Sequence, residues 1–275
     1  MKMDIAFGQY CEGNSILHRL DPRAKLIISI IYIVVLFLAK NVFTFALLTL
    51  TTVALVLLSG ISLRVIAGGL KPILFIALFT AIINIFFFTG DTLLVDLRIV
   101  KIYLEGLINA GLIVLRIVLL IVSTSMFLTY TTTPLALTDG MERLLAPLSK
   151  VGVPVHDFSM MMTIALRFIP TLIEETGKIM NAQKARGADF TSGGLVKRAR
   201  AIIPIIIPLF VSAFRRAGDL ATAMECRCYT GGAGRTRMNV LRAKWYDAAF
   251  VVLVTALGAA VVLMNIYLPG YSVTM

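Results

Sequence analysis

One apolar run, from residue 26 to residue 59, limits most strongly what this chain can fold into. Its only charged or amide side chains are those of Lys40 and Asn41. As one helix, the run would extend about 51 Å at about 1.5 Å per residue, whereas about 20 residues cross a bilayer. We therefore predict a break at Lys40 and Asn41 that divides the run into helices over 26–40 and 42–59.

Two interpretations of this helix pair remain open. In the first, both helices span the membrane, and Lys25 and Lys40 extend their long side chains to its two surfaces. In the second, the pair forms a re-entrant hairpin. Both return the chain to the side on which it began, so the topology beyond residue 59 is the same.

Three further segments have the length and composition of membrane helices. Residues 72–90 carry no charge, residues 107–130 carry only Arg116, and a last helix with its tail occupies residues 246–275. Hydrophobic residues make up 59% of the chain and charged residues 15%, against about 25% charged in a soluble domain. The sequence predicts an all-α membrane protein with about five transmembrane helices.

The distribution of basic residues orients these helices, since Lys and Arg gather in cytoplasmic loops. Residues 1–25 and the loop after residue 59 are basic, whereas the loop after residue 90 has no positive excess and the C-terminal tail is uncharged. We expect a multi-pass protein of a bacterial-type cell membrane, with a cytoplasmic N-terminus and an external C-terminus. Alternating residues at 95–99 suggest a short external hairpin.

Cations and a cap signal lie at the end of the N-terminal segment. Asp21 and Pro22 fit a helix cap and first helical residue. Arg19, Arg23 and Lys25 follow the pattern of anchors at the membrane interface.

Most of the remaining charge lies in residues 131–245, which we expect to form a cytoplasmic domain of helices. A short helix should follow Thr133. A long amphipathic helix should begin with Asp157 as its cap and end near residue 185, and a second should run from about 195 to 229. The apolar part of this second helix, 201–214, is short and holds two prolines, which favours an interfacial or buried helix over a span.

Both long helices end in a similar pattern: a small residue, an arginine, and a second small residue. These tips are Ala185, Arg186 and Gly187 in the first helix, and Cys226, Arg227 and Cys228 in the second. Small residues admit a second surface close to the backbone, and a guanidinium group offers a planar set of five donors. Either the tips dock two similar partner sites, or the arginines simply complement the helix dipoles.

Two other groups of residues are candidates for function. Arg116 lies about 16 Å into its predicted span, where it is either a functional group or a structural one that pairs with backbone carbonyls or with Asn84. Phe158, Met161 and Met162 either fill a core or form a face that repacks against different partners.

Several classes of function lack support in the sequence. Three cysteines and two histidines offer little for a metal site, and Cys226 and Cys228 have neither zinc-knuckle nor redox-motif spacing. The chain has no P-loop, no recognisable catalytic motif and no DNA-binding motif. We therefore expect a non-catalytic chain that has no cofactor of its own and binds no nucleic acid.

Two parts of the chain resemble a known family. They are the N-terminal stretch SILHRLDPRAKL and nearly all of residues 131–238, which begin with TTTPLALTDGMERLLAPL. They resemble the T component of energy-coupling-factor (ECF) transporters of the general, vitamin-uptake type. The resemblance implies a helical membrane domain with coupling helices that cross in an X. It also assigns the two arginine tips to docking of ABC-type ATPases, with Cys226 standing where alanine is expected.

The resemblance further implies the partners. Two ATPase subunits would bind ATP and Mg, and one or more membrane-embedded S components would bind the substrate, with the lipid bilayer around them. A T component dedicated to cobalt or nickel uptake is the nearest relative of this type. From the residues alone, the alternatives are a conventional ABC permease, although no EAA-type coupling loop is visible, and a secondary transporter, although no inverted repeat is visible.

Overall fold

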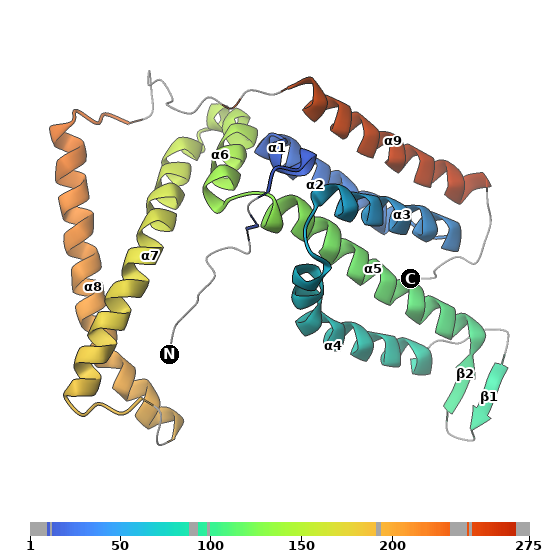
Figure 1. Cartoon of the computed structure of the whole chain (residues 1–275), viewed down its shortest axis with the longest axis horizontal. Coiled ribbons are helices and arrows are strands. Elements are labelled where there is room, and N and C mark those ends of the chain that lie inside the picture. Colours follow the sequence, from blue (N-terminus) through green and yellow to red (C-terminus); the bar gives the residue numbers. More distant parts are fainter. Residues whose placement is uncertain are drawn as a thin grey trace. The chain divides into compact units, whose positions relative to one another are not determined.

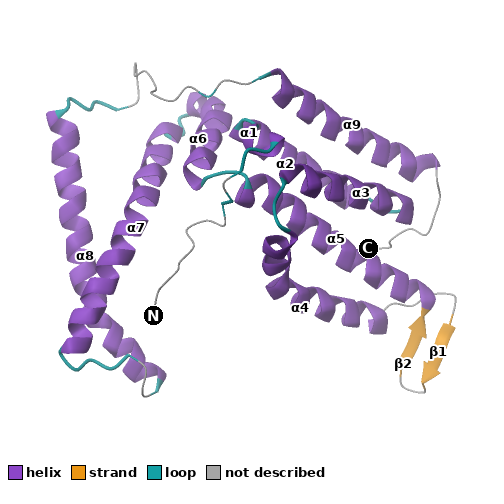
Figure 2. Ribbon diagram, in the orientation of Figure 1, coloured by secondary structure: helices purple, strands orange, loops and turns teal. Residues whose placement is uncertain are grey.

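The computed structural model describes residues 10–11, 13–87, 93–97, 100–190, 194–231, 241 and 244–267. Helices dominate these residues (Figures 1 and 2), as predicted. The helices are α1 (Ile16–Arg19), α2 (Pro22–Leu38), α3 (Val42–Ser59), α4 (Leu63–Phe87), α5 (Leu104–Thr124), α6 (Pro134–Leu145), α7 (Val155–Ala185), α8 (Leu195–Cys226) and α9 (Trp245–Tyr267). The chain forms two compact units, Met1–Arg143 with Leu241–Met275, and Leu144–Val240.

Five of the described helices are long and apolar enough to cross a membrane, judged by length and composition. They are α3, α4, α5 with the π-helical turn that follows it (Ser125–Tyr130), α8 and α9. The predicted number is confirmed, but the set differs from the predicted one. Helix α2 has 17 residues, or about 26 Å, and is shorter than these five helices. Helix α8 qualifies because it is long and contains an 18-residue stretch that is apolar enough and carries few charges.

The predicted break in the long apolar run is present. Helix α2 ends at Leu38 and α3 begins at Val42. Asn41 and Thr44 form a reciprocal capping box, in which each side chain accepts a hydrogen bond from the backbone of the other residue. Gly60 ends α3 with φ +68°, a left-handed conformation that glycine adopts without strain.

The start of α4 differs from the prediction. The sequence placed the helix after Pro72, but α4 begins at Leu63, so Arg64 and Lys71 lie on the helix and not in a loop. Pro72 lies inside the helix, where it removes one backbone hydrogen bond without ending the helix. A proline therefore set the predicted boundary about two turns too late.

The predicted short hairpin is also present. Strands β1 (Leu93–Leu97) and β2 (Val100–Tyr103) pair antiparallel between α4 and α5. The register aligns Asp96 with Lys101 and Leu97 with Val100, and a shift in register lies between Leu93 and Val95.

The core of the first unit lies where α2 meets α3, α5 and α9. Gly258 of α9 allows a close approach to α2, since a Cβ atom there would lie 2.8 Å from Val35. Tyr32 is buried and its hydroxyl group donates to the Leu48 carbonyl at 3.1 Å and contacts the Thr52 hydroxyl at 2.6 Å. Helix α2, although short, is therefore the central element of this unit.

The second unit contains a 3-10 turn (Ala146–Val151), α7 and α8. Helix α7 begins at Val155, so the prediction that Asp157 caps it is wrong. Asp157 lies in the first turn, where a carboxylate still complements the helix dipole. Figure 1 shows α7 and α8 crossing, as the resemblance implied.

Candidate functional site

The two arginine tips are built by the same backbone geometry. Arg186 is the C-cap of α7 and Arg227 is the C-cap of α8, with φ and ψ of −86° and 8° and of −94° and 16°. Each is followed by a residue of positive φ, Gly187 at +85° and Cys228 at +53°. We call Ala185, Arg186 and Gly187 the α7 tip, and Cys226, Arg227 and Cys228 the α8 tip.

Both tips close with a complete Schellman motif, in which two backbone N–H groups donate to carbonyls of the last turn. In the α7 tip, Ala188 donates to Gln183 at 3.0 Å and Gly187 donates to Lys184 at 3.0 Å. In the α8 tip, Tyr229 donates to Met224 at 3.0 Å and Cys228 donates to Glu225 at 2.9 Å.

The six tip residues are exposed. Because the motif satisfies the carbonyls at the end of each helix, neither guanidinium group is needed to cap its own helix. Both arginines therefore present their donors to solvent from the same position on equivalent turns.

The α7 and α8 tips lie far apart within the second unit. Near the crossing, the Arg216 guanidinium donates to the Glu175 carboxylate at 2.7 Å. Arg186 lies about 16 Å along α7 beyond Glu175, and Arg227 lies about the same distance along α8 beyond Arg216. The Tyr229 hydroxyl donates to the Met160 sulfur at 3.0 Å, so the end of α8 lies beside the beginning of α7, while α7 continues to its own tip at the opposite end (Figure 1).

The separation of the tips follows from these contacts. Met160 and Arg186 are separated by about 39 Å of helix. Met160 lies near the α8 tip because it contacts Tyr229, the residue that follows this tip. The tips are thus on the order of 30–40 Å apart, which is too far for one small contact site on one partner.

The side chains of Phe158, Met161 and Met162, which we call the methionine face, are exposed at the beginning of α7. Their exposed fractions are 52%, 58% and 39%. These three side chains are therefore not buried in a core of the second unit, and contact with a partner stays a prediction.

Arg116 has a structural partner. Its guanidinium donates to the Ala39 carbonyl at 2.8 Å and lies 5.2 Å from the centroid of the Phe45 ring. Asn265 donates to the neighbouring Leu38 carbonyl at 2.7 Å. These bonds satisfy the free carbonyls at the end of α2, which a break next to lipid requires. The pairing with backbone carbonyls is confirmed, and Asn84 instead donates to the Thr80 carbonyl.

A buried polar cluster at the start of α2 was missed by the sequence analysis. Lys25 is 2% exposed, and its ammonium group donates to the Thr131 carbonyl at 2.7 Å and to the Thr132 hydroxyl at 3.2 Å. The prediction that Lys25 extends to the membrane surface is therefore wrong. Asp21 caps α2 as predicted, by accepting from the Arg23 N–H at 2.9 Å.

Asp247, which the sequence analysis did not consider, joins this cluster to α9. Its buried carboxylate accepts from the Asp21 N–H at 2.9 Å and the Lys244 N–H at 2.7 Å. The sequence signal was an acidic residue in the first turn of an otherwise apolar helix. In the described residues, no three His, Cys, Asp or Glu side chains are grouped to hold a metal ion.

The comparisons with known proteins identify the family. The model of the family described as CbiQ, cobalt transport protein, matches residues 13–240. The transmembrane protein EcfT of the energy-coupling factor transporter from Ruminiclostridium cellulolyticum is 53% identical over 265 residues, covering 96% of each chain. The chain belongs to the EcfT family.

Other members of the EcfT family are almost as similar. The protein of the same description from Bacillus subtilis is 48% identical over 259 residues, which is 94% of this chain and 97% of the relative. The one from Lactococcus lactis is 47% identical over 262 residues, with 95% and 98% covered. The chain is thus a multi-pass transmembrane component of an energy-coupling factor transporter.

Proposed function

We propose that this chain is the coupling subunit of its transporter and docks two ABC-type ATPases, one at the α7 tip and one at the α8 tip. The observation that carries this proposal is the duplicated geometry: two exposed arginines, each at the C-cap of a Schellman motif, on the order of 30–40 Å apart. Two equivalent tips suit two equivalent partner surfaces, and a guanidinium group suits a carboxylate or a row of carbonyls in a shallow pocket.

The crossed helices would carry motion between the tips and the membrane partner. The Glu175–Arg216 ion pair and the Tyr229–Met160 contact join α7 to α8 at two points, which favours movement of the pair as one element. ATP and Mg would be bound by the ATPases, and this chain would be non-catalytic. We place the N-terminus and the tips in the cytoplasm because the basic residues are concentrated there.

The methionine face is our candidate contact for an S component. Methionine side chains adapt to differently shaped apolar surfaces, and a shared T component must accept several S components. A photo-crosslinking amino acid at Met161 is expected to capture a small membrane protein. The same probe at Val151, an exposed residue outside α7, is the control, and capture at Val151 alone would contradict the assignment.

We infer that the substrates are vitamins, as the resemblance to T components of the general vitamin-uptake type implies. The relatives named EcfT match this chain over nearly its whole length, which supports a T component of this kind. Transport of cobalt is the second candidate, since the matching family model carries that description. In both cases the S component would select the substrate.

The test is to express the chain with its genomic neighbours, purify it through a tag in mild detergent, and identify the proteins that accompany it. Two ABC ATPases and several small hydrophobic proteins are expected for a shared vitamin module. A single dedicated membrane partner and cobalt uptake would favour the second candidate. Purification of the chain without any ATPase would contradict the coupling function.

A further inference from the structure

The polar and apolar residues of α8 are arranged as in a helix that lies on a membrane surface. At about 100° per residue, one exposed face about 140° wide collects six large apolar side chains. This apolar stripe consists of Ile203, Ile206, Ile207, Phe210, Val211 and Phe214. Ile205, on the opposite side of the helix, is buried.

Three cations border the apolar stripe on one side. The same helical geometry places Lys197 and Arg215 beside one edge of the stripe and Arg200 within that edge, one turn before Ile203, and we call these three residues the basic edge. Arg198 and Arg216 lie on the side of Ile205, and Arg216 is paired with Glu175. No Asp or Glu occurs between residues 195 and 218. In the described part of the chain, the three cations of the basic edge have no carboxylate partner.

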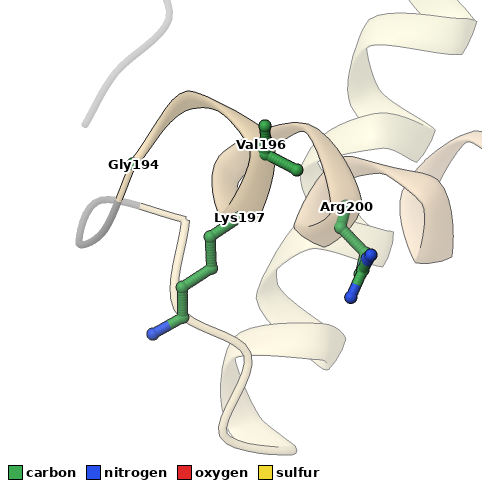
Figure 3. Close-up of a pocket in the computed structure, with 4 residues that line it drawn as sticks. All are labelled: Gly194, Val196, Lys197 and Arg200. Atoms are coloured by element: carbon green, nitrogen blue, oxygen red, sulfur yellow. The ribbon is translucent and has the colours of Figure 1, made fainter.

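A concave site lies at the beginning of the basic edge. Lys197 and Arg200 line it together with Gly194 and Val196, and its volume is about 480 Å³. Figure 3 shows these four residues on the first turns of α8 and the residue before it. The site is open to solvent, and among the described residues its two cationic side chains have no hydrogen-bond acceptor.

The strictly apolar part of α8 is shorter than the hydrocarbon layer of a bilayer, although the whole helix is long enough to cross one. From Ala201 to Phe214 the helix extends about 21 Å, against about 30 Å of hydrocarbon, and cations stand at both ends. A helix with an apolar face, a basic border and no acidic residue there matches the pattern of helices that insert one face at the headgroup boundary.

We propose that α8 binds the surface of an anionic phospholipid membrane, with the apolar stripe in the acyl boundary and the basic edge on phosphate-bearing headgroups. Charge complementarity selects this occupant, since basic side chains beside a membrane attract anionic lipid and gain little from zwitterionic lipid. The coupling helices would then be held at the membrane by a contact that is separate from both arginine tips.

The test uses the full chain reconstituted in vesicles, with a fluorophore at Phe210→Cys after replacement of the three native cysteines by serine. Nitroxide-labelled lipid quenches the fluorophore when α8 lies on the membrane. Vesicles with and without phosphatidylglycerol in phosphatidylcholine are compared. Strong quenching is expected only with phosphatidylglycerol, and salt near 1 M should reduce it by screening.

The decisive variants remove three charges from either helix. In K197Q/R200Q/R215Q, the equilibrium constant between quenched and unquenched states should fall by roughly fivefold per charge, on the order of a hundredfold in total. R167Q/K178Q/K184Q removes the same amount of charge from exposed positions of α7. It should leave this equilibrium constant within about twofold of the value for the unmodified protein. K197Q alone should weaken quenching more than R198Q.

Three outcomes would overturn the proposal. The first is equal quenching in the two kinds of vesicle, and the second is an equal loss of quenching in the two triple variants. The third is protection of the fluorophore only when another membrane protein is co-expressed, which would assign the stripe to a protein partner. Because salt acts on the unmodified basic edge, a folding defect in a variant leaves the proposal testable. No ATPase is present, so failure here and failure of ATPase docking are distinguished.

Discussion

At the scale of single residues, the two tips differ most in the residue that follows the arginine. Gly187 has a positive φ at no steric cost, whereas Cys228 holds φ +53° with a side chain attached. A non-glycine residue in this region costs about 1–2 kcal/mol. The α8 tip is therefore strained relative to the α7 tip, although their hydrogen bonds match.

Replacement of Cys228 by glycine should relieve this strain. We expect Cys228→Gly to stabilise the α8 tip by on the order of 1 kcal/mol, and Gly187→Ala to destabilise the α7 tip by a similar amount. Hydrogen exchange of the peptides around Tyr229 and Ala188, followed by mass spectrometry, measures both effects. Faster exchange near Tyr229 in Cys228→Gly would contradict the strained geometry.

Loss of the buried Lys25 ammonium group should destabilise the first unit. In Lys25→Met, the Thr131 carbonyl and the Thr132 hydroxyl lose a charged donor, and hydrogen bonds to charged groups contribute about 1.5–3 kcal/mol. The thermal midpoint in detergent should fall by several degrees. Lys40→Met, at an exposed lysine, is the matched control. Equal thermal midpoints for the two variants would show that the hydrogen bonds of Lys25 do not stabilise the first unit.

Individual residues also show which structural features the sequence could predict and which it could not. The cap at Asp21 was predicted because Asp followed by Pro is a local signal. The burial of Lys25 was not, since it depends on Thr131 and Thr132, more than a hundred positions away. Arg116 was recognised as unusual, but its partner, the Ala39 carbonyl, became identifiable only in the fold.

At the scale of elements, the crossed pair of α7 and α8 depends on few specific contacts. The Glu175–Arg216 ion pair is partly exposed, with 21% and 38% of the two side chains accessible. Such a pair contributes only about 0.2–1 kcal/mol to stability, so its role would be to fix the crossing geometry.

Breaking this ion pair should broaden the distance between the helices without unfolding them. Spin labels at exposed positions of α7 and α8 on either side of the crossing report that distance by pulsed electron paramagnetic resonance. Glu175→Arg should widen the distribution, and the charge-swapped double variant E175R/R216E should narrow it again. A distribution unchanged in Glu175→Arg would mean that the crossing is fixed by other contacts.

Element boundaries were predictable where chain signals were local. Helix α3 has the predicted bounds because Asn41 and Gly60 are cap signals at its two ends. Helix α4 was placed too late because Pro72 is tolerated inside it. The similarity of the two tips was predictable from the residue pattern. Their Schellman geometry appears only in the backbone hydrogen bonds of the structure, and their separation only in the contacts of Tyr229 and Arg216.

At the scale of the whole molecule, the chain divides into two compact units. The first unit contains one apolar core where α2, α3, α5 and α9 meet and a second where α4 packs against α5 and the π-helical turn, as expected of a membrane domain. The second contains the crossed helices with both arginine tips and the exposed methionine face. Family membership establishes the transporter, and the arrangement of the second unit supports the proposal that this unit couples it to ATP.

The most direct test of the account is charge reversal at the tips in the co-expressed transporter. Wild type should retain two ATPase subunits per chain, and Arg186→Glu/Arg227→Glu should retain none and lose ATP-driven uptake, because each guanidinium donor would be replaced by a carboxylate that faces an acceptor on the ATPase. Each single variant should weaken retention, and Arg167→Glu, at an exposed position of α7, should not. Two ATPases per chain and wild-type uptake in the double variant would contradict the docking role of both arginines.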